Sequence, residues 1–330
     1  MGIPNPKEPA GDDDDNYPVW GIDDKKGSTN HRPNEVDPDA RTSDRNYDVS
    51  GHRNLNKLPS DCGNMDSNRI SAGNRTGLYE MPWMVILSYK KRGESELNCG
   101  GTLINEWYVL TAAHCVSFLS DNLELDHVVL GDWDVTSDPD CEPRVTGLRQ
   151  SCAPPKRNVA IDSIKVHPGY SPQTSYDDIA LIRLAEPADF TLYTMAPICL
   201  PVSRELQNEN LVDEDGTAAG WGITELGYKS SVLLSVQLRI ISNKACQDKF
   251  RGSPRIYDSQ LCAVGEEGRD TCGADSGGPL MFQGRMSDGG LKYVQRGIVS
   301  YGSKRCGVNT VPAVFTRVAY YMDWILNNIR

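Results

Sequence analysis

Residues 268–281 read "GRDTCGADSGGPLM", and this stretch decides how the whole chain is interpreted. Within it, Ser276 follows Asp275 and is followed by Gly277 and Gly278. Glycines let the backbone turn tightly. A serine hydroxyl becomes a good nucleophile only when a base takes its proton and a third group orients that base. The stretch therefore predicts a catalytic serine with a histidine and a carboxylate elsewhere in the chain.

Two other strings supply these partners. "LTAAHCV" contains His114, and "YDDIALIRL" contains Asp178, so the order along the chain is His, Asp, Ser. A histidine or an aspartate in one such string alone is more often structural. The three strings could together supply the nucleophile, the base and the orienting carboxylate.

Composition excludes several classes of function. The formal net charge of −11 argues against nucleic acid as a partner, because phosphate binding needs a basic face. No apolar run approaches the length of a membrane span, so we expect no membrane partner. The last residues instead carry apolar side chains at helical spacing, and these predict a terminal helix docked on the core: Val318, Tyr321, Met322 and Ile325.

Two regions of different texture divide the chain. Residues 1–69 are acidic and polar without sustained periodicity, so we expect a mostly disordered or loosely held segment. Residues 70–330 contain short apolar runs rich in Val, Ile and Tyr, such as "HVVLGDW" and "YVQRGIVSYG". Many short strands and one late helix predict an all-β barrel or sandwich.

Cysteine usage indicates an oxidising compartment. The chain has 10 Cys, an even number, and none forms a CxxC pair. Paired disulfides, typical of secreted proteins, fit better than zinc or thiol chemistry. The opening "MGIPNPKEPAGDDDD" has no apolar segment of the kind found in signal peptides. We therefore expect a secreted, extracellular protein whose true amino terminus lies elsewhere or whose signal has been removed.

Together with "CGGTLI", "AAGWG" and "GIVSYG", the three strings resemble the chymotrypsin-like, trypsin-type serine proteases from Ile70 to Arg330. The resemblance implies two six-stranded antiparallel β-barrels with the site between them, and no cofactor for the chemistry. It gives Ser276 the role of nucleophile, His114 that of general base and then acid, and Asp178 that of orienting carboxylate. The neighbouring Asp177 is rejected because the motif reads Asp-Ile-Ala-Leu.

The same resemblance implies cleavage of protein substrates after Arg or Lys. Asp270 would lie at the base of the S1 pocket, although a surface aspartate is the plainer alternative. Ser300, Gly302 and Ala313 would line the pocket. The oxyanion hole would consist of the amides of Ala274 and Ser276.

Activation and inhibition also follow from the resemblance. A zymogen of this kind would be cut between Arg69 and Ile70, and the new amino group would pair with Asp275. The partners implied are protein substrates, an upstream trypsin-like activating protease and serpin-type inhibitors.

Asn74 begins an N-glycosylation sequon. The disulfides implied are Cys62–Cys199, Cys99–Cys115, Cys141–Cys152, Cys246–Cys262 and Cys272–Cys306.

The loop "LGDWDVTSDPDCEPRVTGLRQSCAPP" narrows the resemblance to arthropod clip-domain proteases, such as easter-like and prophenoloxidase-activating enzymes. This implies a proteolytic cascade of the innate-immunity, melanisation or clotting type. A clip domain needs several cysteines of its own, whereas only Cys62 precedes Ile70 here. In that family the loop can bind calcium, and a solvated acidic loop is the alternative. The matching ligands are the carboxylates of Asp132 and Asp140 and the carbonyls of Asp134 and Ser137.

Two alanines depart from the family pattern. Ala274 and Ala313 replace usual glycines, and a left-handed conformation at Ala274 would cost about 1–2 kcal/mol. They predict a restrained enzyme, unless the loop adjusts and neither alanine matters.

The competing classes are a weak or inactive protease homologue that acts as a cascade binding module, and a venom or digestive trypsin.

Overall fold

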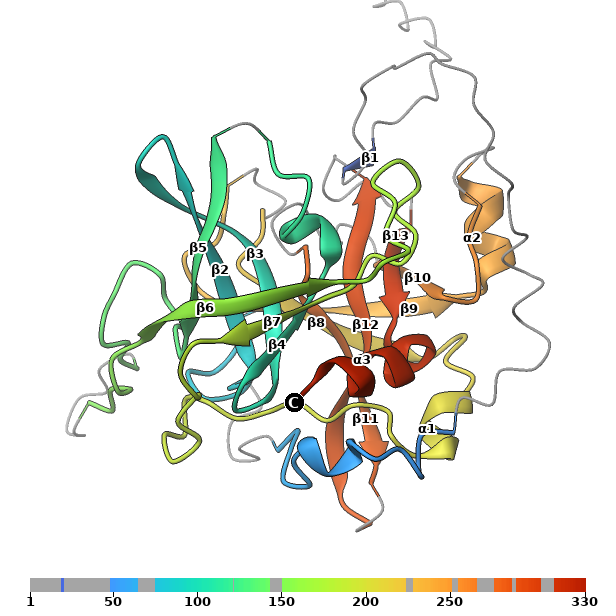
Figure 1. Ribbon diagram of the computed structural model, residues 1–330, viewed down its shortest axis with the longest axis horizontal. Helices are drawn as coiled ribbons and strands as arrows, with labels where there is room; N and C mark the ends of the chain where they lie inside the picture. Colours follow the sequence, from blue (N-terminus) through green and yellow to red (C-terminus); the bar gives the residue numbers. More distant parts are fainter. Residues whose placement is uncertain are drawn as a thin grey trace, which may run out of the picture.

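Strands dominate the architecture. The computed structural model describes residues 19–20, 48–64, 75–120, 122–142, 150–223, 228–250, 255–265, 276–286, 289–303 and 312–330. Figure 1 shows two strand-rich halves side by side, with the carboxyl terminus between them. From β2 onwards, the chain completes the first half before it enters the second.

The first half is a closed antiparallel barrel. Its strands are β2 (Met84–Lys91), β3 (Glu94–Asn105), β4 (Tyr108–Thr111), β5 (Leu123–Leu130), β6 (Arg157–Val166) and β7 (Ala180–Leu184). They pair in the order β2-β3-β4-β7-β6-β5. Val85, Leu87 and Leu110 are fully buried in its core, as expected for apolar residues on pleated strands.

The second half closes in the same manner. Its strands are β8 (Asp215–Gly220), β9 (Leu234–Ile241), β10 (Gln260–Gly265), β11 (Pro279–Arg285), β12 (Leu291–Ser303) and β13 (Ala313–Arg317). They pair in the order β12-β11-β8-β9-β10-β13, and an additional β12–β13 pairing completes the barrel. The predicted pair of six-stranded barrels is therefore confirmed.

Short helices connect and cap the barrels. They are η2 (Leu55–Lys57), η3 (Ala113–Cys115), α1 (Arg204–Asn208), α2 (Asn243–Lys249), η4 (Val318–Tyr321) and α3 (Met322–Asn328). The predicted terminal helix exists as η4 followed by α3, and its four predicted apolar residues are all buried. Among the described residues, no helix combines the length and the apolar character needed to cross a membrane.

Part of the polar leader docks on the barrels. Residues 48–64 run beside α3 and β11 in Figure 1, and Val49 is buried there. Asn54 Nδ2 donates to the carbonyl of Leu326 at 2.8 Å. Asn105 Nδ2 donates to the carbonyl of Lys57 at 3.0 Å, which ties this segment to β3. These residues form a strap under the terminal helix, which a polar and aperiodic sequence did not indicate.

A second piece of the leader pairs with β12 of the second barrel. The two-residue strand β1 (Val19–Trp20) lies antiparallel to β12, with Val19 opposite Ser303 and Trp20 opposite Gly302. Figure 1 shows β1 at the top of β12, far from residues 48–64. The leader therefore contacts β12's barrel at two separate places.

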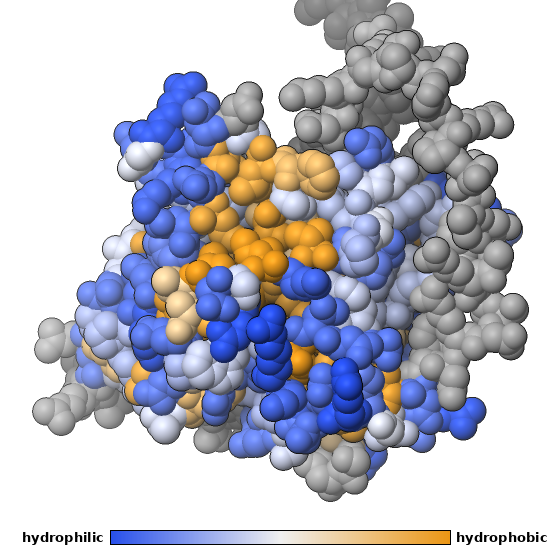
Figure 2. Space-filling view, viewed as in Figure 1, coloured by the Kyte–Doolittle hydropathy of each residue, from blue (hydrophilic) through white to orange (hydrophobic). Residues whose placement is uncertain are grey.

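One face of the molecule carries an apolar area. Figure 2 shows hydrophobic surface in the upper middle of the view, over the place where η3 lies in Figure 1. Phe118, just after η3, is 73% exposed and lies 6.0 Å from Tyr170 between ring centroids. Exposed hydrophobic patches mark interaction surfaces.

Candidate active site

His114 and Asp178 are in direct contact. His114 lies in η3, directly after β4, and Asp178 lies in the loop that leads into β7. Pairing of β4 with β7, including Thr111 opposite Ala180, places the two residues together. His114 Nδ1 lies 2.8 Å from Asp178 Oδ2, and the His114 amide donates to Asp178 Oδ1 at 2.9 Å.

The second barrel holds Asp178 from the other side. Ser300 Oγ on β12 donates to Asp178 Oδ2 at 2.5 Å. Thr316 Oγ1 on β13 donates to the main-chain carbonyl of Asp178 at 2.7 Å. The carboxyl side chain is fully buried, so these donors replace the water that its charge would otherwise require. The site therefore lies where the two barrels meet.

The pKa of His114 reflects two opposing effects. Burial of the imidazole lowers its pKa, whereas the negative charge of Asp178 and the hydrogen bond to it raise the pKa. The second pair of effects is larger in sum, and the pKa of His114 is raised above its ordinary value. An imidazole held in this way is suited to accept and stabilise a proton.

Asp177 has a different set of neighbours. Its carboxylate accepts a hydrogen bond from Tyr321 Oη at 2.6 Å, and its other oxygen lies 3.7 Å from His167 Nδ1. Asp177 has a φ of 52°, in the left-handed region where Asp is better tolerated than most residues. The adjacent acid thus fixes the loop that presents Asp178, and His114 contacts only Asp178 of the two.

Ser276 is connected to the histidine through the first barrel. Its carbonyl accepts a hydrogen bond from the Gly100 amide at 2.8 Å, and Gly100 follows Cys99 on β3. Cys99 is bonded to Cys115, the neighbour of His114. The serine is buried, as expected for a residue held between two barrels.

Gly277 explains why a glycine follows the serine. Its φ is 79°, and its amide donates to the Val299 carbonyl at 2.9 Å. A Cβ at this position would stand 2.5 Å from the Gly100 carbonyl oxygen and even closer to Thr111 Oγ1. Only glycine satisfies both the conformation and the close packing.

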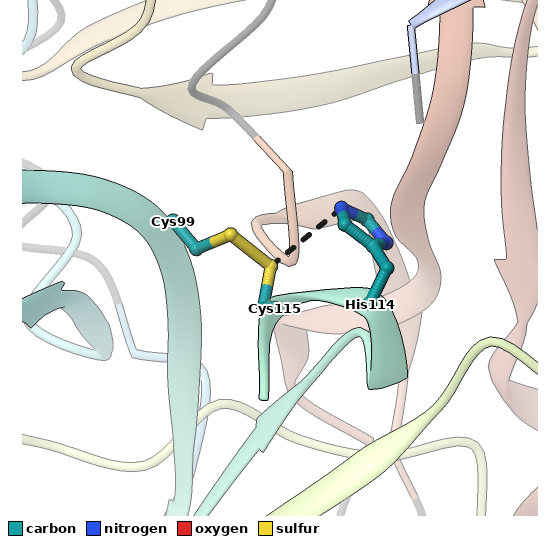
Figure 3. Close-up of side chains that lie close together, drawn as sticks. All are labelled: Cys99, His114 and Cys115. Atoms are coloured by element: carbon teal, nitrogen blue, oxygen red, sulfur yellow. Dashed lines mark hydrogen bonds between the residues drawn. A yellow bond between two sulfur atoms is a disulfide. The ribbon is translucent and has the colours of Figure 1, made fainter. Parts of the chain in front are cut away.

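Two sulfur atoms lie on one side of His114, as Figure 3 shows. The Cys115 Sγ lies 3.7 Å from His114 Nε2, and Cys99, His114 and Cys115 together have the spacing of a metal-binding group. The two sulfurs are joined in a disulfide, however, so neither offers a thiolate to a metal. This cluster braces the histidine loop instead.

Of the residues predicted to line an S1 pocket, the structure describes Ser300, Gly302 and Ala313. Ala313 on β13 is buried opposite Ala263, and Gly302 lies on β12 just beyond Ser300. Ser300, which we expected to line the pocket, donates its hydroxyl hydrogen bond to Asp178. The other predicted positions lie outside the described residues: Arg69, Ile70, Asn74, Asp270, Cys272, Ala274, Asp275 and Cys306.

Four disulfides join the described residues, and one of them, Cys99–Cys115, lies beside His114. The structure contains Cys62–Cys199, Cys99–Cys115, Cys141–Cys152 and Cys246–Cys262, with the pairing expected from the sequence. Cys62–Cys199 fastens the strap of residues 48–64 to the barrels.

The acidic loop after β5 places its carboxylates together. Asp140 is buried and accepts from the amides of Trp133 and Asp134 and from Ser137 Oγ. Asp132 is also buried, and its Oδ2 pairs with Lys156 Nζ at 2.9 Å. The Asp132 Oδ1 is buried with no hydrogen-bond partner. Burial raises the pKa of Asp132, Lys156 opposes this, and the charge of Asp140 adds to the increase.

Comparisons with known proteins agree with this geometry. The family model described as Trypsin matches residues 70–325, and the chain therefore belongs to the trypsin family. It is a trypsin-like serine endopeptidase, an enzyme class that needs no cofactor for its chemistry.

Its relatives include insect proteases. Spaetzle-processing enzyme of Drosophila melanogaster is 41% identical over 275 residues, which cover 80% of this chain and 67% of the relative. Phenoloxidase-activating factor 3 of Holotrichia diomphalia is 40% identical over 274 residues, covering 82% and 75%. The crystal structure of the Drosophila Grass clip serine protease of the Toll pathway superposes with a TM-score of 0.72 at 37% identity, covering 81% of this chain and 73% of the other.

Three hydrogen bonds at the site were not predicted from the sequence. They are the hydroxyl of Ser300 on Asp178, the hydroxyl of Thr316 on the Asp178 carbonyl, and the Tyr321–Asp177 hydrogen bond. Each joins residues far apart in the chain. A polar residue inside an apolar strand, such as the serine in "GIVSYG", is the only local signal for such a buried hydrogen bond.

Proposed function

We propose that His114, Asp178 and Ser276 form the catalytic triad of a secreted peptidase that cuts protein substrates after Arg or Lys. The observation that carries this proposal is the 2.8 Å contact between His114 Nδ1 and Asp178 Oδ2, because it holds the imidazole in the tautomer that a serine nucleophile requires.

The reaction proceeds in two proton transfers. His114 Nε2 takes the proton of Ser276 Oγ as the oxygen attacks the scissile carbonyl, and the imidazolium then protonates the leaving amine. Water attacks the resulting acyl-enzyme with the same histidine as base, which restores the free serine. The amides of Ala274 and Ser276 bind the oxyanion in both halves. Asp178 stabilises the imidazolium throughout.

Specificity for Arg or Lys rests on Asp270 at the base of the S1 pocket. A buried carboxylate binds a guanidinium or an ammonium of the substrate by charge-assisted hydrogen bonds. Gly302 keeps the entrance open, and Ala313 adds a methyl group to the wall. Asp270→Ser should lower kcat/KM for an Arg-containing peptide amide far more than for a Leu-containing one.

The chain is made as a zymogen and activated by cleavage between Arg69 and Ile70. An upstream trypsin-like protease makes this cut, and the new amino group of Ile70 pairs with Asp275. The relatives named for Spaetzle processing and phenoloxidase activation support a place in an extracellular cascade of limited proteolysis. Serpin-type inhibitors are the natural antagonists of such an enzyme. The disulfides fit an oxidising compartment.

Covalent labelling tests the proposal directly. After cleavage at Arg69, a serine-directed phosphonate should label the enzyme stoichiometrically, and mass spectrometry should place the label on Ser276. Ser276→Ala should abolish labelling without changing thermal unfolding. An inactive homologue that serves as a cascade binding module would remain unlabelled, and that result would overturn the proposal.

A structural calcium ion fits the acidic loop only in part. The loop carries two buried carboxylates, those of Asp132 and Asp140, and Asp132 Oδ1 has no hydrogen-bond partner and could serve as a hard oxygen ligand of calcium. The Lys156 ammonium already neutralises the other oxygen of Asp132. We propose that calcium, when bound, is held by the carboxylates of Asp132 and Asp140 with the carbonyls of Asp134 and Ser137, and competes with Lys156.

A further inference from the structure

The edge of β12 extends beyond its neighbour near the candidate nucleophile. β11 begins at Pro279, which lies opposite Ile298 of β12. The chain just before β11 stays close to β12, because the Gly277 amide donates to the Val299 carbonyl and the Val299 amide donates to the Gly278 carbonyl. Residues 300–303 of β12 therefore continue past the start of β11, alongside the segment that carries Ser276.

This extension of β12 also touches the rest of the site. Ser300 is the first residue of this extension, and its hydroxyl donates to Asp178. The extension therefore begins at the triad. A strand edge presents main-chain donors and acceptors to any extended peptide. A peptide that pairs antiparallel with residues 300–303 runs, from its amino to its carboxyl end, towards Ser276. That is the path a substrate needs in order to present its scissile bond.

β1 lies on this same edge. Val19 stands opposite Ser303 and Trp20 opposite Gly302, and the pairing is antiparallel. Figure 1 shows β1 at the top of β12. The two residues of β1 therefore have the chain direction that a substrate would take. The three residues after Trp20 are Gly21, Ile22 and Asp23, none of which is basic. A peptidase that requires Arg or Lys has no residue to cut there.

We infer that β1 is a built-in competitor for substrate, which occupies the main-chain edge at Gly302 and Ser303 without being cleaved. The inference rests on the proposed function, because it assigns this edge to substrate binding. The disulfide Cys62–Cys199 keeps the leader attached after cleavage at Arg69, so the competitor persists in the activated enzyme. Attachment through the same chain keeps β1 at a raised effective concentration beside the edge, so even a weak strand raises KM about two- to tenfold.

Proline substitutions in the full chain test the inference. Val19→Pro with Trp20→Pro removes two main-chain donors from β1 and prevents regular pairing. After activation, KM for a peptide with at least three residues before its Arg should fall about two- to tenfold, with kcat unchanged. An Arg anilide blocked at its own amino group cannot use the edge, and its KM should not change. Val36→Pro, a leader residue outside β1, is the matched control.

A binding measurement gives a readout independent of turnover. A fluorescent peptide of residues 14–25 should bind the double proline variant more tightly than the wild-type chain, whose edge is occupied, and should compete with the long substrate. Equal binding to both chains, or an unchanged KM for the long peptide, would overturn the inference. Failure of the phosphonate to label Ser276 in every chain would instead overturn the proposed function, and peptide binding would still decide the role of β1.

Discussion

Ser300 Oγ donates a hydrogen bond of 2.5 Å to Asp178 Oδ2, the same oxygen that lies 2.8 Å from His114 Nδ1. Ser300 belongs to the second barrel and His114 to the first, so a single carboxylate oxygen joins the two halves of the enzyme. A substitution at Ser300 should therefore change the electrostatic environment of His114 as well as the contact between the two barrels.

Ser300→Ala should change the pH profile. Loss of the hydroxyl leaves more of the Asp178 charge to act on His114, and this charge raises the pKa of His114. The base must be neutral to accept a proton, so activity is lost as the pH falls through this pKa. We expect the acid limb of kcat/KM to move to higher pH and kcat to fall about tenfold, as for loss of a hydrogen bond to a charged group.

Thr316→Val is the control for this prediction. Its hydroxyl contacts the main-chain carbonyl of Asp178 and not the carboxylate. The variant should lower the free energy of unfolding by about 1 kcal/mol and leave the acid limb in place. If both variants shift the limb equally, or neither does, Ser300 has no specific effect on the histidine.

Gly277→Ala should disable the nucleophile loop. The φ of 79° and the Gly100 carbonyl 2.5 Å from the added Cβ require the loop to move away from β3. We expect loss of phosphonate labelling at Ser276 and a destabilisation well above the 1–2 kcal/mol that left-handed strain alone costs. Labelling by mass spectrometry and thermal unfolding measure the two effects.

Gly289→Ala separates strain from crowding. Gly289 has a φ of 81°, yet a Cβ there would meet nothing within 4 Å. This variant should show only the strain of about 1–2 kcal/mol and should label normally. Similar behaviour of the two alanine variants would contradict the role given to packing at Gly277.

The sequence predicted most of the fold and the triad candidates because short motifs report local requirements. Ser276 and its glycines, the histidine in "AAHC" and the aspartate in "DIAL" are recognisable within a few residues. The hydrogen bonds of Ser300 and Thr316 to Asp178 depend on the register of β12 and β13, which no local string contains. The sequence therefore predicted the candidate reacting groups, but it did not predict the hydroxyls of Ser300 and Thr316 that position Asp178.

The leader shows the same limit from another side. Its few apolar residues are dispersed among Asp, Asn and Gly, so no period marks Val49 or Leu55 as contacts of the core. The pairing of Val19 and Trp20 with β12 depends on an edge built by residues far along the chain. Composition predicted a mostly disordered or loosely held leader, and the tertiary structure gives it two docking places.

Lys156→Gln should make the acidic loop depend on calcium. Asp132 is buried, and removal of its ammonium partner leaves an uncompensated charge, which costs about 3 kcal/mol. The Lys156 ammonium lowers the raised pKa of Asp132. In the variant, the Asp132 carboxyl should therefore keep its proton to higher pH. Calcium should restore the melting temperature of the variant and raise that of the wild-type chain much less.

The exposed Lys165→Gln on β6 is the matched lysine control, and calcium should not distinguish it from wild type. Titration calorimetry checks the stoichiometry. If calcium stabilises wild type and Lys156→Gln equally, Lys156 does not compete for the site. If it stabilises neither, the acidic loop is not a calcium site, and the bare cost of losing the ion pair is what remains.

The strap of residues 48–64 should stay bound after activation even without its disulfide. Asn54 Nδ2 donates to the Leu326 carbonyl at 2.8 Å, the Gly63 amide donates to the Pro197 carbonyl at 2.8 Å, and Val49 is buried. In the Cys62→Ser, Cys199→Ser chain cut at Arg69, the leader should therefore elute with the peptidase in gel filtration. It should separate only in denaturant.

Adding Asn54→Ala should weaken this association about fivefold, as expected for one hydrogen bond of about 1 kcal/mol. Asn64→Ala is the matched control, because Asn64 Nδ2 bonds to Asp61 within the strap itself and makes no contribution across the interface through that bond. Separate elution of the cut leader under native conditions would mean that the Cys62–Cys199 disulfide alone holds it. The strap would then be a tether, and α3 would have to remain folded without Asn54 at its last carbonyls.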